Sequence, residues 1–275
     1  ILDNSGEGDI VPLAPAIRYA VDNGANVINI SAVGFENGDK DDIKQAVKHA
    51  YEKGVVVVAA AGNGNTYLNA SPLYPICADL GSGGQMVLGV SAVTPDHHLT
   101  RFSNTGSNCI DITAPGIDVS STVRFSPTNG LTQRYKGGWS GTSFAAPLVS
   151  GAAALIKSIQ PSWGAKEIYI TLLSTVHHTG GQDEAVYADL FGNGLLQIDK
   201  AVKYAVDNIK SARPIKTFAL ARPKTGDKGI LLSSTKEIKG DFDHDGQDEL
   251  VIFEDTLDPG YATVRDHDGR LMFNF

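Results

Sequence analysis

The feature that most constrains the fold is a run of apolar residues from Val55 to Ala60 that contains four consecutive valines. A strand with one face in water alternates apolar and polar residues, so an unbroken apolar run predicts a strand buried on both faces. Residues 43–50, which precede it, carry apolar side chains at helical spacing, and Gly54 ends this pattern. The sequence therefore places a helix directly before a buried strand.

The same succession of helix and apolar strand occurs along the rest of the chain. Residues 10–21 predict a helix, and strands are expected over Val27–Ile30, Met86–Val93 and Ile110–Ala114. Fully apolar strands that alternate with helices are typical of an α/β fold with a parallel β-sheet and helices on both faces. Three further helices are expected, over Ser143–Ile156, over Ser162–Ser174 with Ser162 as N-cap, and over 195–205.

Charge is unevenly distributed along the chain. There are 23 basic and 31 acidic residues, and the net charge of −8 argues against a nucleic-acid partner. Residues 240–275 contain ten of the acidic residues and only two of the basic residues, which leaves 21 of each in residues 1–239. This break predicts an α/β domain over 1–210, a linker over 211–228, and a small β-rich acidic module over 229–275.

Two further features concern the environment of the protein. No stretch approaches the roughly 18 consecutive apolar residues of a membrane-spanning helix, so we expect no membrane span. The two cysteines, Cys77 and Cys109, allow at most one internal disulfide and have no metal-ligand spacing. A disulfide and two buried thiols both fit the sequence, so cysteine usage leaves the compartment open.

Gly141-Thr142-Ser143 places a hydroxyl at the start of an expected helix. Unpaired N–H groups and the positive end of the helix dipole favour an oxyanion there, which suits acyl transfer. The small residues that follow, such as Ala145 and Ala146, would let the helix be closely buried and would hold the hydroxyl in place. The alternative is a plain N-cap hydroxyl on a buried helix.

Asn63 directly follows the valine-rich strand, in Gly62-Asn63-Gly64. Ligands of parallel sheets bind at the carboxyl ends of the strands, and an asparagine side chain there can donate an N–H to an oxyanion. Read alone, the same residues predict a turn with left-handed backbone conformations.

Together these segments resemble the subtilases, the subtilisin-like serine proteases. Residues 141–151 match the family's Gly-Thr-Ser-x-Ala-x-Pro-x-Val-x-Gly motif at every defined position, and residues 60–63 are similar to its oxyanion motif. Residues 27–31, 114–116 and 192–195 follow in family order, so the resemblance covers roughly residues 1 to 205. It implies a subtilisin-like fold, hydrolysis of peptide bonds by a serine endopeptidase, peptide or protein substrates, and an extracellular or periplasmic location.

The resemblance also implies roles for individual residues. Ser143 would be the nucleophile that forms an acyl-enzyme, and the Asn63 side chain would stabilise the oxyanion together with the N–H of Ser143. Val33 stands where the family usually has glycine, which we expect to narrow or reshape the cleft. Two backbone segments would flank the substrate side chain, namely Ser31, Ala32, Val33 and Gly34, and Ala60, Ala61 and Gly62.

Two parts of the subtilase site do not occur in the sequence. The family's aspartate motif and its His-Gly-Thr-His helix should both precede a strand that we expect to end at Leu2. A serine without a general base is a weak nucleophile at neutral pH, so we expect this chain alone to be nearly inactive. The seven histidines, none of which matches the motif, are His49, His97, His98, His177, His178, His244 and His267.

Two explanations fit this pattern. The one we favour is that the chain is the C-terminal portion of a subtilase, completed by a separate Asp and His segment as its partner, because Ser143 and Asn63 are both retained. The alternative is a catalytically inactive subtilase-like scaffold or a calcium-dependent binding protein.

The acidic module contains a loop with calcium-type spacing. Oxygen ligands occur at alternate positions, in Asp241, Asp243, Asp245, the Gln247 carbonyl and Glu249. An apolar strand pattern follows at once, so the loop is not an EF-hand and instead resembles the short calcium loop of FG-GAP repeats. We expect calcium to bind here. The related segment 266–269 lacks the flanking acids and predicts a plain hairpin turn.

Overall fold

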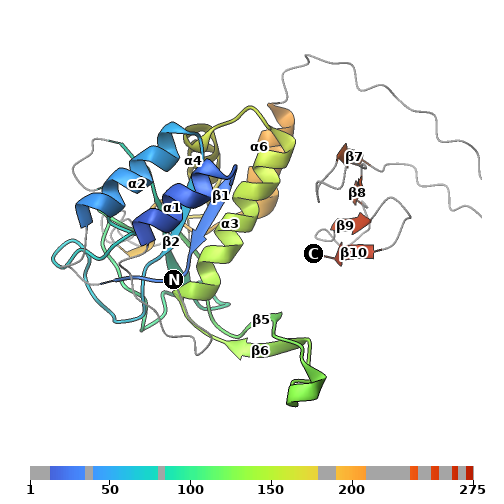
Figure 1. Cartoon of the computed structure of the whole chain (residues 1–275), viewed down its shortest axis with the longest axis horizontal. Helices are drawn as coiled ribbons and strands as arrows, with labels where there is room; N and C mark the ends of the chain where they lie inside the picture. Colours follow the sequence, from blue (N-terminus) through green and yellow to red (C-terminus); the bar gives the residue numbers. More distant parts are fainter. Residues whose placement is uncertain are drawn as a thin grey trace, which may run out of the picture. The chain divides into compact units, whose positions relative to one another are not determined.

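The computed structural model describes residues 13–34, 40–79, 84–178 and 190–208, together with the backbone of four strands between 236 and 274. The chain divides into two compact units, Ile1–Lys210 and Ser211–Phe275. In the described part of the first unit, helices cover both faces of a parallel sheet (Figure 1). This arrangement confirms the α/β fold class expected from the sequence.

The described sheet of the first unit has its strands in the same order in space as along the chain. They are β1 (Val27–Ile30), β2 (Val56–Ala60), β3 (Leu88–Val93) and β4 (Ile112–Pro115). Each neighbouring pair is parallel; in β2 and β3, for example, Val58 lies opposite Leu88. All four strands therefore end at one edge of the sheet, and the loops that follow them lie together there.

Strand β2 is buried on both faces, as its apolar run predicts. Val57 and Ala59 belong to a core cluster on the side of α1 (Leu13–Asp22) and α2 (Lys40–Glu52). The alternate residues of β2 belong to a second cluster on the side of α3 (Thr142–Ile159), α4 (Ala165–Ser174) and α6 (Ile198–Asp207). Because successive side chains point to opposite faces, one strand anchors both halves of the core.

Helix α3 packs against all four strands of this sheet and also contacts α4 and α6. Four of its small residues, Ala145, Ala146, Ala152 and Ala153, are buried. Short side chains let a helix approach its neighbours closely, which is the arrangement expected from the sequence. Of the described helices, α3 alone is long and apolar enough to cross a membrane, but its buried face forms part of the core of this unit.

Two helix starts differ from the expectations. Helix α4 begins at Ala165, so Ser162 is not its N-cap; the N–H of Gly164 instead donates to the Glu167 carboxylate at 3.0 Å. Helix α6 begins after Leu196 because the N–H groups of Leu195 and Leu196 donate to carbonyl groups of residues far away in sequence. In both places the contacts of the folded chain override the local apolar spacing.

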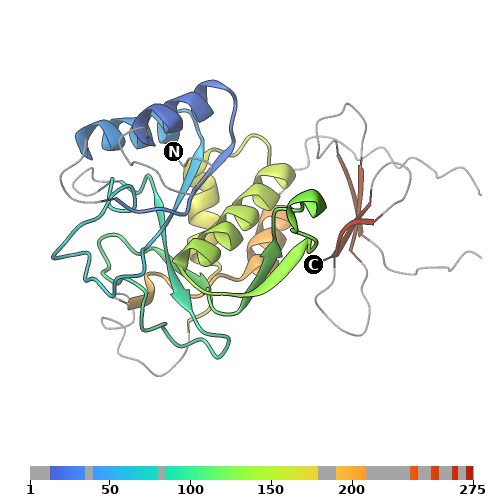
Figure 2. The same ribbon diagram turned by 60° about the horizontal axis from the view of Figure 1, so that its bottom comes forward.

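The sequence pattern does not predict the hairpin formed by β5 (Val119–Thr122) and β6 (Tyr135–Trp139). The two strands are antiparallel, and a short 3-10 turn, Pro127–Asn129, lies in their connection. Figure 1 shows the hairpin extending away from the sheet and helices of the first unit, and in Figure 2 it is turned toward the viewer. Most of its residues are exposed, so it lacks the alternation of apolar and polar residues by which a strand is recognised.

The second unit contains a described antiparallel sheet in the order β10-β9-β8-β7. Its strands are β7 (Lys236–Gly240), β8 (Glu249–Phe253), β9 (Ala262–Arg265) and β10 (Leu271–Asn274). The described part of this unit is therefore β-rich, as expected. Five features expected from the sequence lie outside the described residues: the segment expected to end at Leu2, the linker 211–228, loop residues 241–248, the side chain of Glu249 and the turn 266–269.

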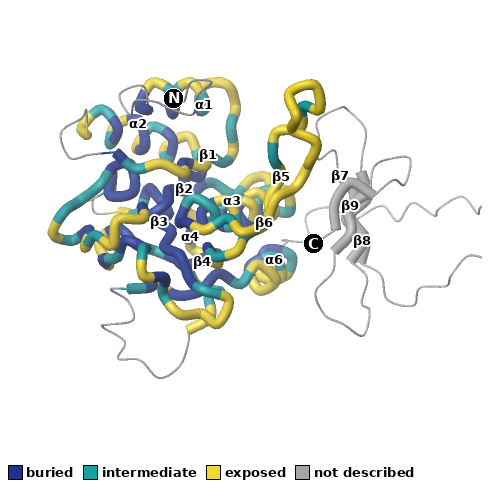
Figure 3. The backbone as a smooth tube through the Cα atoms, turned by 90° about the horizontal axis from the view of Figure 1, so that it is seen from below, coloured by how far each residue is buried: buried dark blue, intermediate teal, exposed yellow. Residues whose placement is uncertain are grey.

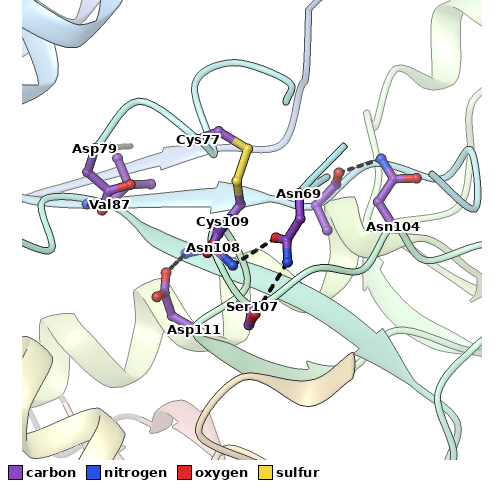
Figure 4. Close-up of a disulfide and its surroundings, with 11 residues drawn as sticks. Asn69, Cys77, Asp79, Val87, Asn104, Ser107, Asn108, Cys109 and Asp111 are labelled. Carbon is purple, nitrogen blue, oxygen red and sulfur yellow. Dashed lines mark hydrogen bonds between the residues drawn. A yellow bond between two sulfur atoms is a disulfide. The ribbon is translucent and has the colours of Figure 1, made fainter. Parts of the chain in front are cut away.

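Cys77 and Cys109 form a disulfide, with their Cα atoms 4.9 Å apart (Figure 4). The bond links the segment after β2 to the segment before β4, and both residues are buried. Gly89 of β3 lies against the same place, because a Cβ atom at position 89 would lie 1.8 Å from the Cys109 carbonyl oxygen. The sequence leaves a disulfide and two buried thiols open, and the structure contains the disulfide.

Two carboxyl groups lie beside this disulfide, on Asp79 and Asp111 (Figure 4). Asp79 accepts the N–H of Met86 at 3.1 Å, and Asp111 accepts the N–H of Gly89 at 2.6 Å. Desolvation raises the pKa of Asp111 well above its usual range, and the neighbouring charge of Asp79 raises it further, although the Gly89 hydrogen bond acts in the opposite direction. Burial also raises the pKa of Asp79.

These shifts predict a stability that falls as the pH rises. Above the usual aspartate pKa of 3.8, the unfolded chain has lost a proton that the folded chain still holds on Asp111, so unfolding releases a proton. The free energy of unfolding should therefore fall, by up to about 1.4 kcal/mol per pH unit, until the pH passes the folded-state pKa. In Asp111→Asn this fall should be smaller, which urea unfolding from about pH 4 to about pH 7 measures. The assignment would be contradicted if the free energy of unfolding fell with pH as steeply in Asp111→Asn as in the unaltered protein. It would also be contradicted if the exposed-site control Asp199→Asn made this fall as small as Asp111→Asn does.

Candidate active site

Ser143 lies in the first turn of α3, at the edge where β1 and β2 end. Gly141 precedes the helix with φ 149°, a conformation that side chains rarely adopt, and its N–H donates to the Gly116 carbonyl at 2.8 Å. A Cβ atom at position 141 would lie 3.3 Å from Asn63 Nδ2. Glycine therefore allows the start of the helix to lie directly against the end of β2.

The Asn63 carboxamide is held in a fixed orientation by Thr142. Asn63 Oδ1 accepts hydrogen bonds from the Thr142 N–H at 2.9 Å and from Thr142 Oγ1 at 3.0 Å. Thr142 Oγ1 in turn accepts the Gly62 N–H at 3.0 Å. With its oxygen occupied, the exposed carboxamide presents Nδ2 as a donor, and this nitrogen has no hydrogen bond to another described residue.

Ser143 and Ser31 exchange two hydrogen bonds. Ser143 Oγ donates to the Ser31 carbonyl at 3.1 Å, and Ser31 Oγ donates to the Ser143 carbonyl at 3.0 Å. The Ser143 N–H belongs to the first helical turn, where no preceding carbonyl is available, and it has no acceptor among the described residues. The hydroxyl, this N–H and the Asn63 amide thus come from adjoining residues, with Thr142 between them.

A chain of polar side chains continues from Ser31 along the open side of β1. Asn29 Nδ2 donates to Ser31 Oγ at 2.9 Å, and Ser150 Oγ donates to Asn29 Oδ1 at 2.9 Å. Asn29 and Ser150 therefore fix the position of Ser31, the residue that contacts Ser143. Sequence analysis does not identify either residue, because their relation crosses from β1 to α3.

The two predicted substrate-binding segments differ in their free backbone groups. The Ala61 carbonyl accepts from the Asn104 side chain at 2.7 Å, and the Gly62 N–H is bonded to Thr142, so residues 60–62 offer a surface and few hydrogen-bonding groups. Ser31 and Ala32 are exposed. Val33 Cγ2 lies 3.0 Å from the position of a Cβ at Gly62, so the two segments meet at this contact. The effect of Val33 on a cleft stays a prediction.

Asn104 is a positioning residue that sequence analysis misses. It is buried, and its side chain and backbone make four hydrogen bonds to the segment 61–66, which carries Asn63 (Figure 4 labels Asn104 and draws one of these bonds). Its Oδ1 accepts the N–H groups of Gly64 at 3.0 Å and Thr66 at 2.8 Å, and its own N–H donates to the Gly62 carbonyl at 3.0 Å. An asparagine in a polar loop gives no local signal of such a role.

The described histidines lie in contacts of their own. His49 Nε2 lies 3.2 Å from Asp22, and His98 Nε2 lies 3.6 Å from the aspartate two positions before it. The rings of His97 and His177 meet edge to face, with centroids 6.4 Å apart. His244 and His267 fall outside the described residues. Within the described part of the chain, no group of three or more His, Cys, Asp or Glu residues is placed to hold a metal ion.

Comparison with known proteins gives a consistent result. A family model described as the subtilase family matches residues 1–195. Subtilisin DY of Bacillus licheniformis is 35% identical over 204 residues, covering 74% of this chain and 66% of that protein. Alkaline elastase YaB of Bacillus sp. (strain YaB) is 33% identical over 203 residues, covering 74% of this chain and 47% of that protein. The chain thus spans between about half and two thirds of the length of these relatives.

Solved structures show the same fold. The prenylagaramide maturation protease superposes with a TM-score of 0.59 at 27% identity, covering 74% of this chain and 71% of that one. A protease of Pseudoalteromonas arctica PAMC 21717 superposes with a TM-score of 0.57 at 28% identity, covering 72% of this chain and 59% of that one.

The contacts of Asn104 predict a large effect of its removal. Asn104→Ala leaves the Ala61 carbonyl and the Gly64 and Thr66 N–H groups without their partner, and each unsatisfied group costs about 1 to 3 kcal/mol when buried. Because the Gly64 and Thr66 N–H groups are only partly buried, we expect the free energy of unfolding to fall by about 2 to 3 kcal/mol in urea titrations. The matched control, Asn108→Ala, changes an exposed asparagine nearby and should alter it by less than about 0.5 kcal/mol. Equal effects of the two substitutions would contradict this role.

Proposed function

This chain belongs to the subtilase family, and from that premise we propose that it is the nucleophile-bearing part of a serine endopeptidase. In this proposal Ser143 Oγ attacks the carbonyl carbon of a peptide bond and forms an acyl-enzyme, which water then hydrolyses. The observation that carries the proposal is the arrangement of Asn63 and Ser143 around Thr142, in which two N–H donors and one hydroxyl come from adjoining residues.

The two donors are suited to the charge that develops during the attack. When Oγ bonds to the carbonyl carbon, the carbonyl oxygen becomes negative, and it can be stabilised by Asn63 Nδ2 and by the Ser143 N–H at the positive end of α3. The orientation of Asn63 is set in advance by Thr142, so little reorganisation is needed in the transition state. If Ser143 were only an N-cap hydroxyl of a buried helix, nothing would require the Asn63 amide to be held beside it.

The reaction also requires a group that accepts the Ser143 proton and passes it to the leaving amine. A carbonyl such as that of Ser31, the present partner of Oγ, cannot do this because it is not basic. We propose that an aspartate and histidine segment absent from this chain supplies the base, and that this chain without it is nearly inactive.

The open side of β1 supports this part of the proposal. Within the described sheet β1 is the end strand, and its apolar Val27 and Ile28 are only half-buried, whereas every residue of β2 is buried. The outer edge of an end strand presents unpaired N–H and C=O groups, along which a further strand can pair. A segment pairing along β1 would lie next to Ser31 and therefore next to Ser143.

Peptides or proteins are the proposed substrates, and an extracellular or periplasmic location is proposed for the protein. The Cys77–Cys109 disulfide supports such a location, because disulfides persist in oxidising compartments.

Labelling with a serine-reactive fluorophosphonate tests the proposed nucleophile. In the protein as encoded, together with any sequence that precedes residue 1, we expect labelling at Ser143, and Ser143→Ala should abolish both labelling and hydrolysis of a casein substrate. Asn63→Ala should slow the reaction by about 10² to 10³ because one oxyanion donor is lost.

The controls are Ser158→Ala, which removes an exposed hydroxyl farther along α3, and Asn108→Ala, which removes an exposed amide; both should leave the labelling rate within about twofold. A folded protein in which Ser143 does not react at all would instead favour the inactive scaffold. Reaction of this chain by itself at the full rate would refute the need for a separate base.

We also propose that the acidic segment 241–249 binds calcium, with Asp241, Asp243, Asp245, Gln247 and Glu249 as ligands. The backbone of Gly240 pairs with that of Glu249 in the β7–β8 ladder, so the segment connects two paired strands. Carboxylate and carbonyl oxygens are the ligands that calcium prefers. The likeness of this segment to an FG-GAP loop stays a prediction.

Calorimetric titration tests this site. Calcium should bind with a Kd of about 10⁻⁵ to 10⁻³ M and should raise the melting temperature, because a ligand of the folded state stabilises it. The triple change Asp241→Asn, Asp243→Asn and Asp245→Asn should abolish both effects. A matched change of Asp41, Asp199 and Asp207 to asparagine, at helix positions of the first unit, should keep them. No calcium effect on the unaltered protein would refute the site.

A further inference from the structure

The β5–β6 hairpin has a charge opposite to that of the chain as a whole. We refer to residues 117–140 as the basic hairpin. They contain three basic residues, Arg124, Arg134 and Lys136, and one acidic residue, Asp118, in a chain with a net charge of −8. All three cationic residues are exposed. Figure 3 shows the hairpin in yellow along nearly its whole length.

The positive charges of the basic hairpin are not neutralised within the described part of the protein. None of its three cationic side chains forms an ion pair with a described residue. The Arg134 guanidinium lies 4.4 Å from the ring centroid of Phe125, and Lys136 Nζ lies 5.0 Å from that of Trp139. Packing on a ring orients a cation but leaves its N–H groups available to carboxylates.

Large apolar side chains are exposed beside these charges. Tyr135 is 71% exposed, Phe125 45% and Leu131 43%. A two-stranded hairpin is only marginally stable by itself, yet these side chains do not contribute to either core cluster of the sheet. In the described two-stranded sheet, β5 and β6 also each have one unpaired edge, along which an extended polypeptide can add a strand.

The base of the basic hairpin is attached to the start of α3. The Trp139 ring stacks on that of Phe144 with centroids 5.7 Å apart, and the Asp118 N–H donates to Ser140 Oγ at 3.3 Å. Tyr135 precedes Ser143 by eight positions, so the two lie within about 29 Å, the reach of a fully extended segment of that length. A polypeptide positioned at Ser143 can therefore reach the hairpin with about eight or nine residues.

We propose that the basic hairpin binds an acidic segment of a polypeptide, and that this polypeptide is the substrate on which Ser143 acts. Its identity as the substrate rests on the proposed function, whereas the binding of the acidic segment does not. Nucleic acids and anionic membranes also carry negative charge, but the net charge of −8 opposes a long polyanion. The open strand edges and the adjoining serine favour a polypeptide.

Fluorescence anisotropy with two labelled peptides of about ten residues tests the proposal: one has glutamate at alternate positions, and the other has glutamine at the same positions. The protein carries Ser143→Ala so that neither peptide is cleaved. The hairpin variant combines Arg124→Gln, Arg134→Gln and Lys136→Gln. The control variant combines Lys53→Gln, Lys166→Gln and Lys200→Gln, which are exposed lysines of the first unit and change the net charge equally.

We expect the unaltered chain and the control variant to bind the glutamate peptide about tenfold more tightly than the glutamine peptide, since each surface charge pair contributes modestly. The hairpin variant should lose this preference. If its melting temperature differs from that of the control variant, Arg134→Gln alone is used, with an expected loss of about threefold. Equal affinity of the unaltered chain for both peptides, or an unchanged preference in the hairpin variant, would overturn the proposal. So would equally tight, hairpin-dependent binding of phosphatidylserine vesicles or single-stranded DNA.

The results separate this inference from the proposed function. If Ser143 fails to react with the fluorophosphonate but the peptide preference depends on the hairpin, the endopeptidase and the substrate assignment both fall while the binding of acidic segments stands. If Ser143 reacts and no peptide preference is found, the hairpin inference alone falls.

Discussion

The start of α3 and the end of β2 are joined by three hydrogen bonds that all involve Thr142. Its N–H and hydroxyl both donate to Asn63 Oδ1, and its hydroxyl oxygen accepts the N–H of Gly62. Each bond contributes only about 1 kcal/mol of net stability, but together they determine which end of the carboxamide faces outward. A carboxamide turned the other way would present an acceptor to the oxyanion, which would repel it.

This local arrangement depends in turn on how closely α3 approaches the sheet. The buried alanines of α3 leave little side-chain volume between its axis and β1–β4, so the first turn of the helix lies directly behind the strand ends. Asn104 holds the other side of the site by bonding to the backbone on both sides of Asn63. Rigid packing behind the site and a buried amide beside it thus position Ser143 and Asn63 independently of any ligand.

Much of this fold can be predicted from the sequence, because burial on two faces leaves a continuous apolar run such as that of β2, and a closely packed helix requires small residues such as those of α3. The features that escape prediction depend on residues far apart in the chain. Asn104 lies about 40 positions from its partners in the segment 64–66, and the starts of α4 and α6 are decided by tertiary contacts. The β5–β6 hairpin is exposed and rich in small polar residues, so it has no apolar alternation to reveal it. Whether Cys77 and Cys109 bond also depends on a distance that exists only in the folded chain.

Gly89 illustrates how a residue without chemistry can be as restricted as a nucleophile. The Cys109 carbonyl oxygen occupies the position where any side chain at residue 89 would begin, so even alanine would push β3 away from the segment before β4. A saturation mutagenesis screen scored by activity would therefore record position 89 among the least tolerant of the chain, alongside Ser143. To separate such steric intolerance from loss of catalysis, the amount of soluble protein must be measured for every variant together with its turnover.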